Sequence, residues 1–392
     1  MHKVYLKKGK EIPVKNKHHW IFSGGIQKAP IFQDGDFAEI YSYHNEFLGH
    51  AYLNNKTVIT ARIVNFNRED PIETIKKNIS NSFKLRIKLF DENTNCYRVI
   101  NSEGDLIPGL TVDRYNNILV LQISTVGIDR IKDVIVSELK EFSKKNSLGI
   151  STIYEKSLMS SRKIDGLTDF EGTLWGEDNL TTEVLENGIK FYVDIKNSQK
   201  TGLFLDMREM RKFVGEISKG KSVLNCFGYT GGFSLYAIRG GATKVDTVDI
   251  GKDAIESAKK NFEINGFETS DNGFFATDVF DFIDKNNLNY DLVILDPPAF
   301  AKKKQDIRNA QNGYYRLNKQ ALSKMSSGSF LLTCSCSYHV NMEMFQDIVK
   351  KAAKDSGKSL KILQKHRLAQ DHPLNIFHSE IDYLKSLLVY VE

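Results

Sequence analysis

The sequence predicts an α/β protein whose largest part is a doubly wound, mostly parallel sheet, preceded by a small β-barrel and an α+β region. Two observations carry this prediction. From Asn197 onward, short apolar runs alternate with segments of helical spacing, which is typical of a parallel sheet covered by helices. Residues 1–70 instead hold short alternating runs separated by turn residues, a pattern that favours a small all-β domain. A chain of 392 residues has room for roughly two or three such domains.

Composition limits the classes of protein that need to be considered. Apolar residues make up 41% of the chain and the net charge is +5, which is compatible with a nucleic-acid partner without requiring one. No apolar run is long enough to span a bilayer, so we expect no membrane partner. The four cysteines show no framework spacing and follow no signal-like segment, so we expect a cytoplasmic protein. Cys334 and Cys336 lack a second pair at metal-binding spacing, and we expect no metal.

The first domain is predicted over residues 1–70. Strands are expected at Phe37–Tyr43, Phe47–Leu53 and Val58–Val64, and lysines crowd the region before them. The segment His18–Gly25, HHWIFSGG, resembles the opening of PUA-type RNA-binding domains. That resemblance implies an RNA partner, whereas core packing is the alternative role for the aromatic residues of this segment.

A middle domain is predicted over residues 71–180. Helices are expected at Ile72–Phe90 and Ile128–Lys144, and strands at Ile118–Ser124 and Thr152–Glu155. The first helix is strongly basic on one side, and residues 160–180 are interpreted as a connection. The third domain, over residues 181–392, begins with a predicted hairpin at Thr182–Ile195.

The third domain is organised around Val223–Ala237, VLNCFGYTGGFSLYA. This stretch predicts a strand, a tight glycine-rich turn and a helix that starts at the turn. Glycines let a backbone approach a ligand closely, and a helix N-terminus offers free N–H groups. We therefore expect a nucleotide-like cofactor here, although a simple strand–turn–helix packing joint would give the same pattern.

Acidic residues follow the next three predicted strands. Asp249 ends the second strand, where a carboxylate can accept hydrogen bonds from ribose hydroxyls. Asp278 follows the third strand, and Asp296 begins the rigid loop Asp296–Phe300, DPPAF, after the fourth. Because parallel strands end at one edge of a sheet, these residues together predict a cofactor-dependent enzyme.

The turn Asn225–Gly232, NCFGYTGG, does not match the G-x-G-x-x-G pattern of NAD-binding folds. It resembles the S-adenosylmethionine (SAM) motif of class I methyltransferases, whose domain is Rossmann-like. Tyr229 stands where many of these enzymes have glycine, which affects the expected path of the loop. The resemblance implies SAM as the cofactor, and the residues then expected to contact it in this region are Asn225, Phe227, Gly228, Thr230, Gly231, Asp249, Asp278 and Asp296.

The fifth predicted strand runs into Thr333–Ser337, TCSCS, which places cysteines at the same sheet edge. A thiolate that adds to C6 of a cytosine makes C5 nucleophilic enough to accept a methyl group. An acid that protonates or hydrogen-bonds N3 assists the addition, and Asp296 is the candidate. The alternative is that both cysteines are small buried residues.

The chain resembles the 23S ribosomal RNA 5-methylcytosine methyltransferases along nearly its whole length. The resemblance is carried by GLFLDMREMR at 202–211, VDIGKDAIESAKKNFEINGF at 248–267, DLVILDPPAF, TCSCS, and DHPLNIFHSEIDYLK at 371–385. It implies that Cys336 is the nucleophile, that large-subunit ribosomal RNA is the partner, and that Lys200, Phe204 and Arg208 belong to a segment that closes over SAM. Whether the chain forms a homodimer is left open by the sequence.

Three other functions fit parts of the sequence. An enzyme that methylates an exocyclic amine of an RNA base would need the proline-rich loop but no cysteine. A SAM-binding RNA assembly factor would need neither Asp296 nor Cys336 for its role. A small-molecule methyltransferase would have no use for an RNA-binding domain.

Overall fold

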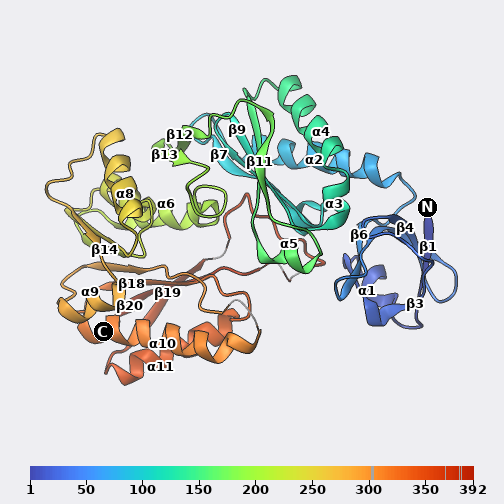
Figure 1. Cartoon of the computed structure of the whole chain (residues 1–392). Coiled ribbons are helices and arrows are strands. Elements are labelled where there is room, and N and C mark those ends of the chain that lie inside the picture. Colours follow the sequence, from blue (N-terminus) through green and yellow to red (C-terminus); the bar gives the residue numbers. More distant parts are fainter. Residues whose placement is uncertain (302–303, 367, 379, 381) are drawn as a thin grey trace. The chain divides into compact units, whose positions relative to one another are not determined.

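The computed structural model describes residues 1–301, 304–366, 368–378, 380 and 382–392. The chain forms two compact units (Figure 1). The first comprises Met1–Leu185, Val193–Leu205 and Gln370–Ile381, and the second comprises Glu186–Tyr192, Asp206–Ala369 and Asp382–Glu392. Both predicted N-terminal domains fall in the first unit, and the boundary between them at residue 70 stays a prediction.

The N-terminal strands form one mixed sheet in the order β2-β6-β5-β4-β1-β3. Its strands are β1 His2–Leu6, β2 Trp20–Phe22, β3 Ile26–Lys28, β4 Phe37–Tyr41, β5 Phe47–Leu53 and β6 Ile59–Asn65, with the short helix α1 Ile12–Lys15 between β1 and β2. Alternating residues of these strands, such as Ile40 and Ile63, are completely buried, as expected for a sheet with one face in a core. The three predicted strands are therefore present.

Helix α2, Pro71–Leu89, follows this sheet. Its start is set by sequence, because the Asp70 side chain accepts hydrogen bonds from the amides of Ile72 and Glu73 at 2.9 and 3.1 Å, and proline is favoured in a first helical turn. One of its basic residues is structural: Arg86 is buried and forms a bidentate ion pair with Asp105.

A five-stranded sheet completes the first unit, in the order β11-β10-β9-β8-β7. Its strands are β7 Cys96–Asn101, β8 Leu110–Tyr115, β9 Ile118–Ile123, β10 Thr152–Ser157 and β11 Phe170–Gly176, and its helices are α3 Val126–Arg130, α4 Lys132–Lys145 and α5 Ser160–Ile164. Two expectations were wrong. The single helix expected over 128–144 is interrupted at Ile131, and residues 160–180 contain α5 and β11 rather than a plain connection. Strand β11 lies at the sheet edge and is only partly buried, so its sequence lacks the alternation of a half-buried strand.

The second unit is a seven-stranded sheet in the order β16-β15-β14-β17-β18-β20-β19. Strands β14 Ser222–Cys226, β15 Lys244–Asp249, β16 Gly273–Ala276, β17 Leu292–Leu295 and β18 Phe330–Ser335 are parallel, while β19 Leu360–His366 and β20 Lys385–Val391 complete it in antiparallel pairings. The order reverses between β14 and β17, and such a switch point is where ligands bind in open α/β sheets. Strand β19 was not anticipated from the sequence. It is mostly exposed, so it gives a weak apolar signal.

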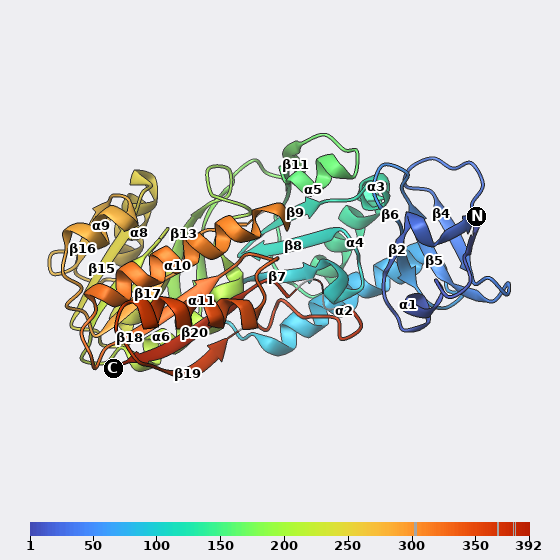
Figure 2. The same cartoon turned by 90° about the horizontal axis from the view of Figure 1, so that it is seen from below.

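Helices cover both faces of this sheet (Figures 1 and 2). Helices α9 Val279–Lys285, α10 Ile307–Lys324 and α11 Met342–Asp355 pack on one face, and α6 Arg208–Ile217 and α7 Gly232–Arg239 contribute to the core on the other. Helix α8 Lys252–Ile264 packs beside α7 against β15 and β16. Strands β12 Thr181–Glu186 and β13 Ile189–Asp194 form the predicted hairpin.

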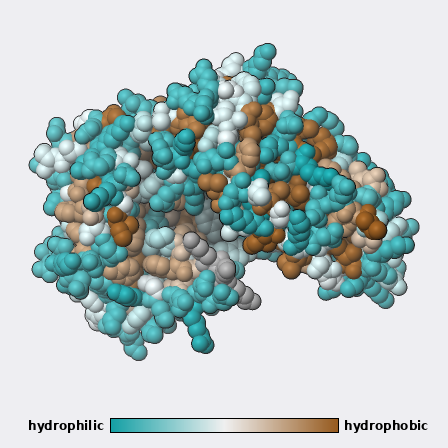
Figure 3. Space-filling model, viewed as in Figure 1, coloured by the Kyte–Doolittle hydropathy of each residue, from teal (hydrophilic) through white to brown (hydrophobic). Residues whose placement is uncertain are grey.

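Hydrophilic residues dominate the face drawn in Figure 3, and hydrophobic residues occur there in small separate groups. Within the residues that the structure describes, no helix is both long and apolar enough to cross a bilayer.

Candidate active site

The glycine turn, Phe227–Gly231, joins the end of β14 to the start of α7. Three of its residues have positive φ angles: Phe227 at 59°, Tyr229 at 46° and Gly231 at 79°. Tyr229, the residue that departs from the usual glycine, therefore adopts the left-handed conformation that glycine would take. The turn is tight with tyrosine at this position, because the Gly231 amide donates to the Gly228 carbonyl at 2.8 Å.

Gly228 is required at its position by close packing. Its amide donates to the Val248 carbonyl at 3.0 Å, and a Cβ added to it would lie 2.4 Å from Cγ2 of Thr247. No larger residue fits unless the Thr247 side chain moves. The turn is thus a cradle of backbone at a strand end, which suits a ligand that the chain must approach closely.

Asn225 lies beneath this turn and is completely buried. Its Nδ2 donates to Ser234 Oγ at 2.9 Å, while its Oδ1 has no hydrogen-bond partner among the described residues. A buried carbonyl oxygen without a partner is costly. An acceptor at this place fits a nearby ligand with hydrogen-bond donors, such as a nucleoside.

The predicted acidic residues lie at the same sheet edge. Asp249 Oδ2 accepts from the Tyr229 amide at 3.0 Å and Oδ1 from the Gly251 amide at 2.9 Å, so the turn and the carboxylate are held together. Each oxygen keeps a second lone pair for a ligand hydroxyl. Asp278 caps α9 by accepting from the Asp281 amide at 3.1 Å. Thr230 is fixed through its carbonyl, which accepts from Asn261 Nδ2 at 2.9 Å.

The fourth and fifth strand ends meet directly. Cys336 follows β18, is half-buried, and its Sγ lies 3.7 Å from the Pro297 carbonyl oxygen, within donor distance for a thiol. Pro297 belongs to the loop that Asp296 begins after β17. The sequence expectation that Cys336 and Asp296 occupy neighbouring strand ends is therefore consistent with this contact.

The other cysteines of the second unit are enclosed. Cys334 lies within β18, has no exposed surface, and its pKa is raised well above the usual value, chiefly by burial and also by the negative charge of Asp296. Cys226 is the last residue of β14 rather than a residue of the turn, and burial likewise raises its pKa. A thiol whose pKa is raised is a poor source of thiolate.

Ser337 anchors the segment after Cys336. Its Oγ accepts from the Ala301 amide at 3.2 Å and lies 2.9 Å from the hydroxyl of Tyr314. The cysteine therefore sits on a fixed backbone.

Lys385, the first residue of β20, was not identified from the sequence. It pairs with Ser335 in the antiparallel register and is only 4% exposed. Its Nζ donates to the carbonyls of Ser337 at 2.7 Å and Tyr383 at 2.6 Å. Burial lowers the pKa of Lys385 to about 8, and the charge of Cys336 opposes this shift. The only available signal was a lysine opening an apolar strand, KSLLVYV.

The segment expected to close over SAM is divided between the units. Lys200 and Phe204 belong to the first unit, where Nζ of the exposed Lys200 lies 4.6 Å from the centre of the Phe204 ring. Arg208 belongs to the second unit, is buried, and has its Nε 3.5 Å from Oε2 of Glu186. Roles for these three residues stay predictions.

Comparison with known proteins identifies the class of protein to which this chain belongs. Residues 162–373 match the family model described as S-adenosylmethionine-dependent methyltransferase, and residues 4–66 match that of the PUA-like domain. The chain is therefore a SAM-dependent methyltransferase that carries an N-terminal PUA-like domain.

Close relatives narrow the family. The chain is 37% identical to the ribosomal RNA large subunit methyltransferase I of Aeromonas hydrophila over 98% of both chains, and 37% identical to that of Aliivibrio fischeri over 97% of both. It belongs to the ribosomal RNA large subunit methyltransferase I family.

Solved structures support the fold. The structure of SMU.776 complexed with SAH has a TM-score of 0.85 at 24% identity, and covers 99% of this chain and 100% of its own. A Streptococcus mutans protein grouped with the SAM-dependent methyltransferases gives 0.83 at the same identity and coverage.

Proposed function

We propose that this enzyme methylates C5 of a cytosine in large-subunit ribosomal RNA through a covalent bond between Cys336 and the base. The observation that carries the proposal is the position of Cys336: a half-buried thiol at a strand end, with its Sγ 3.7 Å from the Pro297 carbonyl of the neighbouring strand end. The names of the relatives support the RNA substrate, as does the PUA-like match.

The glycine turn and its neighbours suit the cofactor. In our proposal Asn225, Phe227, Gly228, Thr230 and Gly231 surround it. The carboxylates of Asp249, Asp278 and Asp296 then offer acceptors for its ribose, adenine and cationic parts. Bound SAM supplies an electrophilic methyl group. The fit rests on the backbone cradle at Gly228 and on the buried acceptor of Asn225.

The chain's own groups perform the remaining steps. The Cys336 thiolate forms a bond to C6 of the cytosine, while Asp296 donates a hydrogen bond or a proton at N3. The electron pair then available at C5 would form the new carbon–carbon bond to the methyl group, whose bond to the cofactor sulfur would break with its electron pair kept by that sulfur. Water then takes the C5 proton, and the electron pair of the C5–H bond restores the C5–C6 double bond and expels the Cys336 thiolate from C6. N3 returns to Asp296 any proton that it took.

Lys385 is assigned here as a positioning residue for Cys336. Its ammonium group is buried and donates to the carbonyl of Ser337, the residue directly after Cys336. A positive charge in a low-dielectric environment stabilises a nearby thiolate. The other ionisable groups that interact with this site are Asp206, Asp296, Cys334, Tyr314 and Asp382. Lys385 is the only cation among the ionisable groups named for this site.

Methylation of an exocyclic amine is the alternative that the site argues against. That reaction needs a free carbonyl in the proline-rich loop to hold the amine. Here the Pro297 carbonyl faces the Cys336 thiol, so the loop and the cysteine form a pair rather than an amine-binding clamp.

The test is to map methylated nucleotides by mass spectrometry in ribosomal RNA from cells that lack this protein, complemented with the wild type, Cys336→Ala or Cys334→Ala. We expect one 5-methylcytosine of the large subunit to disappear and to return with the wild type and Cys334→Ala only. Full methylation with Cys336→Ala would contradict the covalent mechanism. Loss of an N-methylated base instead would establish the amine reaction.

A further inference from the structure

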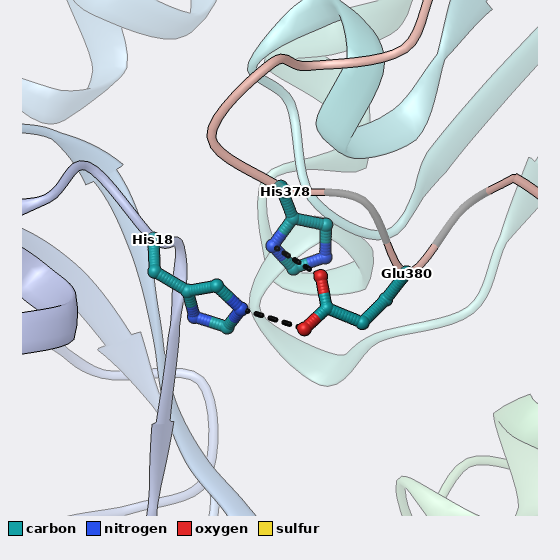
Figure 4. Close-up of side chains that lie close together, drawn as sticks. All are labelled: His18, His378 and Glu380. Atoms are coloured by element: carbon teal, nitrogen blue, oxygen red, sulfur yellow. Dashed lines mark hydrogen bonds and ion pairs between the residues drawn. The ribbon is translucent and has the colours of Figure 1, made fainter.

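A second group of ionisable side chains lies in the first unit, far along the sequence from the residues discussed so far. Figure 4 shows His18, which precedes β2, facing His378 and Glu380 of the C-terminal segment. One donor atom from each of the three residues lies within 4.8 Å of the others. His18 Nε2 lies 3.1 Å from Glu380 Oε1, and His378 Nδ1 lies 3.8 Å from Glu380 Oε2.

His378 is the unusual member of this group. Its side chain has no exposed surface, and neither ring nitrogen has a hydrogen-bond partner among the described residues. The rings of His18 and Trp20 pack on it, with centroids at 4.6 and 4.4 Å. A buried nitrogen without a hydrogen-bond partner is unfavourable, and a ligand bonded to a nitrogen of His378 would remove that cost.

The chemistry of the donors favours a metal ion as that group. Imidazole nitrogens are common metal ligands, and those of His378 make no hydrogen bond among the described residues. His18 Nδ1 lies 3.2 Å from the Trp20 amide nitrogen, which can donate to it, and 3.3 Å from the Trp20 carbonyl oxygen, which can accept from it. A metal ion bound at Nε2 selects the second arrangement, in which Nδ1 carries the proton and donates to the carbonyl.

The spacing of the donors also fits. Ligands bonded at about 2 Å to a tetrahedral ion lie roughly 3.3 Å apart. His18 Nε2 lies 3.1 Å from one carboxylate oxygen of Glu380, and His378 Nδ1 lies 3.8 Å from the other. The Glu380 side chain is 35% exposed and that of His18 is 17% exposed, so an ion can enter from solvent. Glu103 adds negative charge nearby, where it accepts from Trp20 Nε1 at 2.8 Å.

We infer that His18, His378 and Glu380 form a binding site for one divalent transition metal ion, of which Zn²⁺ is the most suitable, with water as a fourth ligand. Two histidines and one carboxylate are a common ligand set for this ion. The bound ion links the start of β2 to the C-terminal segment, since His18 and Glu380 are 362 positions apart in the chain. The role is therefore structural, and it is independent of the proposed reaction. The sequence gave no reason to expect this site, because none of its three ligands is a cysteine and they are far apart along the chain.

The test uses the full chain, stripped of metal with EDTA and titrated with Co²⁺, whose visible absorption reports tetrahedral coordination. We expect one Co²⁺ per chain, displaceable by Zn²⁺ and without a sulfur-to-metal charge-transfer band. Glu380→Gln and His18→Asn should weaken binding by at least about 100-fold, whereas His44→Asn, a change at an exposed turn, should not. Zn²⁺ should raise the melting temperature of the wild type and not that of Glu380→Gln.

Glu380→Gln keeps the test decisive if His18→Asn fails to fold, because the glutamate is partly exposed. The inference is overturned by a wild type that binds no stoichiometric Co²⁺, since the three residues would then form only an ion pair with a neighbouring histidine. Equal binding in Glu380→Gln, or a charge-transfer band from a cysteine ligand, would also overturn it.

Discussion

The glycine turn and the cysteine end of the sheet, Asp296–Ala301 with Cys334–Ser337, lie at one sheet edge but are built differently. The glycine turn is a backbone structure: Gly228 bonds to Val248 through main-chain atoms, and Asp249 accepts two amides. The cysteine end is a side-chain structure, in which the Cys336 thiol, the Ser337 hydroxyl and the Lys385 ammonium come from two strands.

This difference separates binding from reaction in our account. A turn whose contacts are made by backbone can hold a cofactor but offers no nucleophile. The cysteine end holds Cys336, the proposed nucleophile, whose protonation state would depend on nearby charge. Changes at the first place should therefore alter cofactor affinity and stability, and changes at the second should alter the rate of transfer.

The largest expected effect is that of Cys336→Ala. Removal of the nucleophile should lower methyl transfer on the order of 10³-fold or more, while SAM affinity changes little. Cys334→Ala is the matched control, two residues away and fully buried; it should lose about 1 kcal/mol of stability and keep transfer within a few-fold. Single-turnover rates and isothermal titration separate the two quantities. Equal rate losses in both variants would remove the distinction between the cysteines.

Asp249→Asn should alter cofactor affinity rather than the rate of methyl transfer. An acceptor for a cofactor hydroxyl is weakened, so the Kd for SAM should rise about 10–100-fold, with the rate at saturating SAM within a few-fold of the wild type. The exposed Asp253 of α8 supplies the control Asp253→Asn, for which no change is expected. A variant Asp249→Asn with unchanged Kd and a reduced saturated rate would place this carboxylate in the reaction instead.

Gly228→Ala tests the backbone cradle itself. Its new Cβ would lie 2.4 Å from Thr247 Cγ2, and the required shift should reduce the free energy of unfolding by about 1–3 kcal/mol and weaken SAM binding. Gly24 has open space around it, so Gly24→Ala should stay within about 0.5 kcal/mol of the wild type. Chemical denaturation measures both. If the two variants are equally stable, the turn is not closely packed.

Lys385→Met should give the smallest effect. Loss of the buried charge should raise the pH at which Cys336 reacts with iodoacetamide by about one unit, and Lys385→Arg should recover part of the shift. In the wild type, Lys385 has a pKa of about 8, so its ammonium group is present below that pH and its support for the thiolate is lost as the pH rises through 8. The exposed Lys361 of β19 provides the control Lys361→Met. If the alkylation profile of Lys385→Met is unchanged, Lys385 contributes to packing and not to the ionisation of Cys336, whatever the effect of the substitution on methylation.

Much of the second unit could be predicted because local pattern determines it. The apolar runs that became β14, β17 and β18 are buried strands. Their alternation with helices along the chain is enough to predict that Asp249 and Asp296 lie at one sheet edge. The family resemblance pointed to Cys336 rather than Cys334. In the structure Cys334 is buried and Cys336 is half-buried, and the role of Cys336 stays a prediction.

The missing parts depend on tertiary contacts or on partial burial. Lys385 reaches the cysteine end only because β20 pairs with β18 in antiparallel register, which no local pattern specifies. Strands β11 and β19 are partly or mostly exposed, so hydrophobic alternation did not identify them. The sequence also holds a basic run, Lys302–Lys304, of which the first two residues and the side chain of the third lie outside the described part of the chain.

The most direct test of the central claim is a search for the covalent intermediate. Ribosomal RNA containing 5-fluorocytosine has no C5 proton to lose, so a reaction through C6 addition should stop with the enzyme attached to the base. We expect a SAM-dependent protein–RNA adduct that survives denaturation, with peptide mass mapping placing the link on Cys336. Methylation without any adduct, or an adduct on Cys334, would contradict the account.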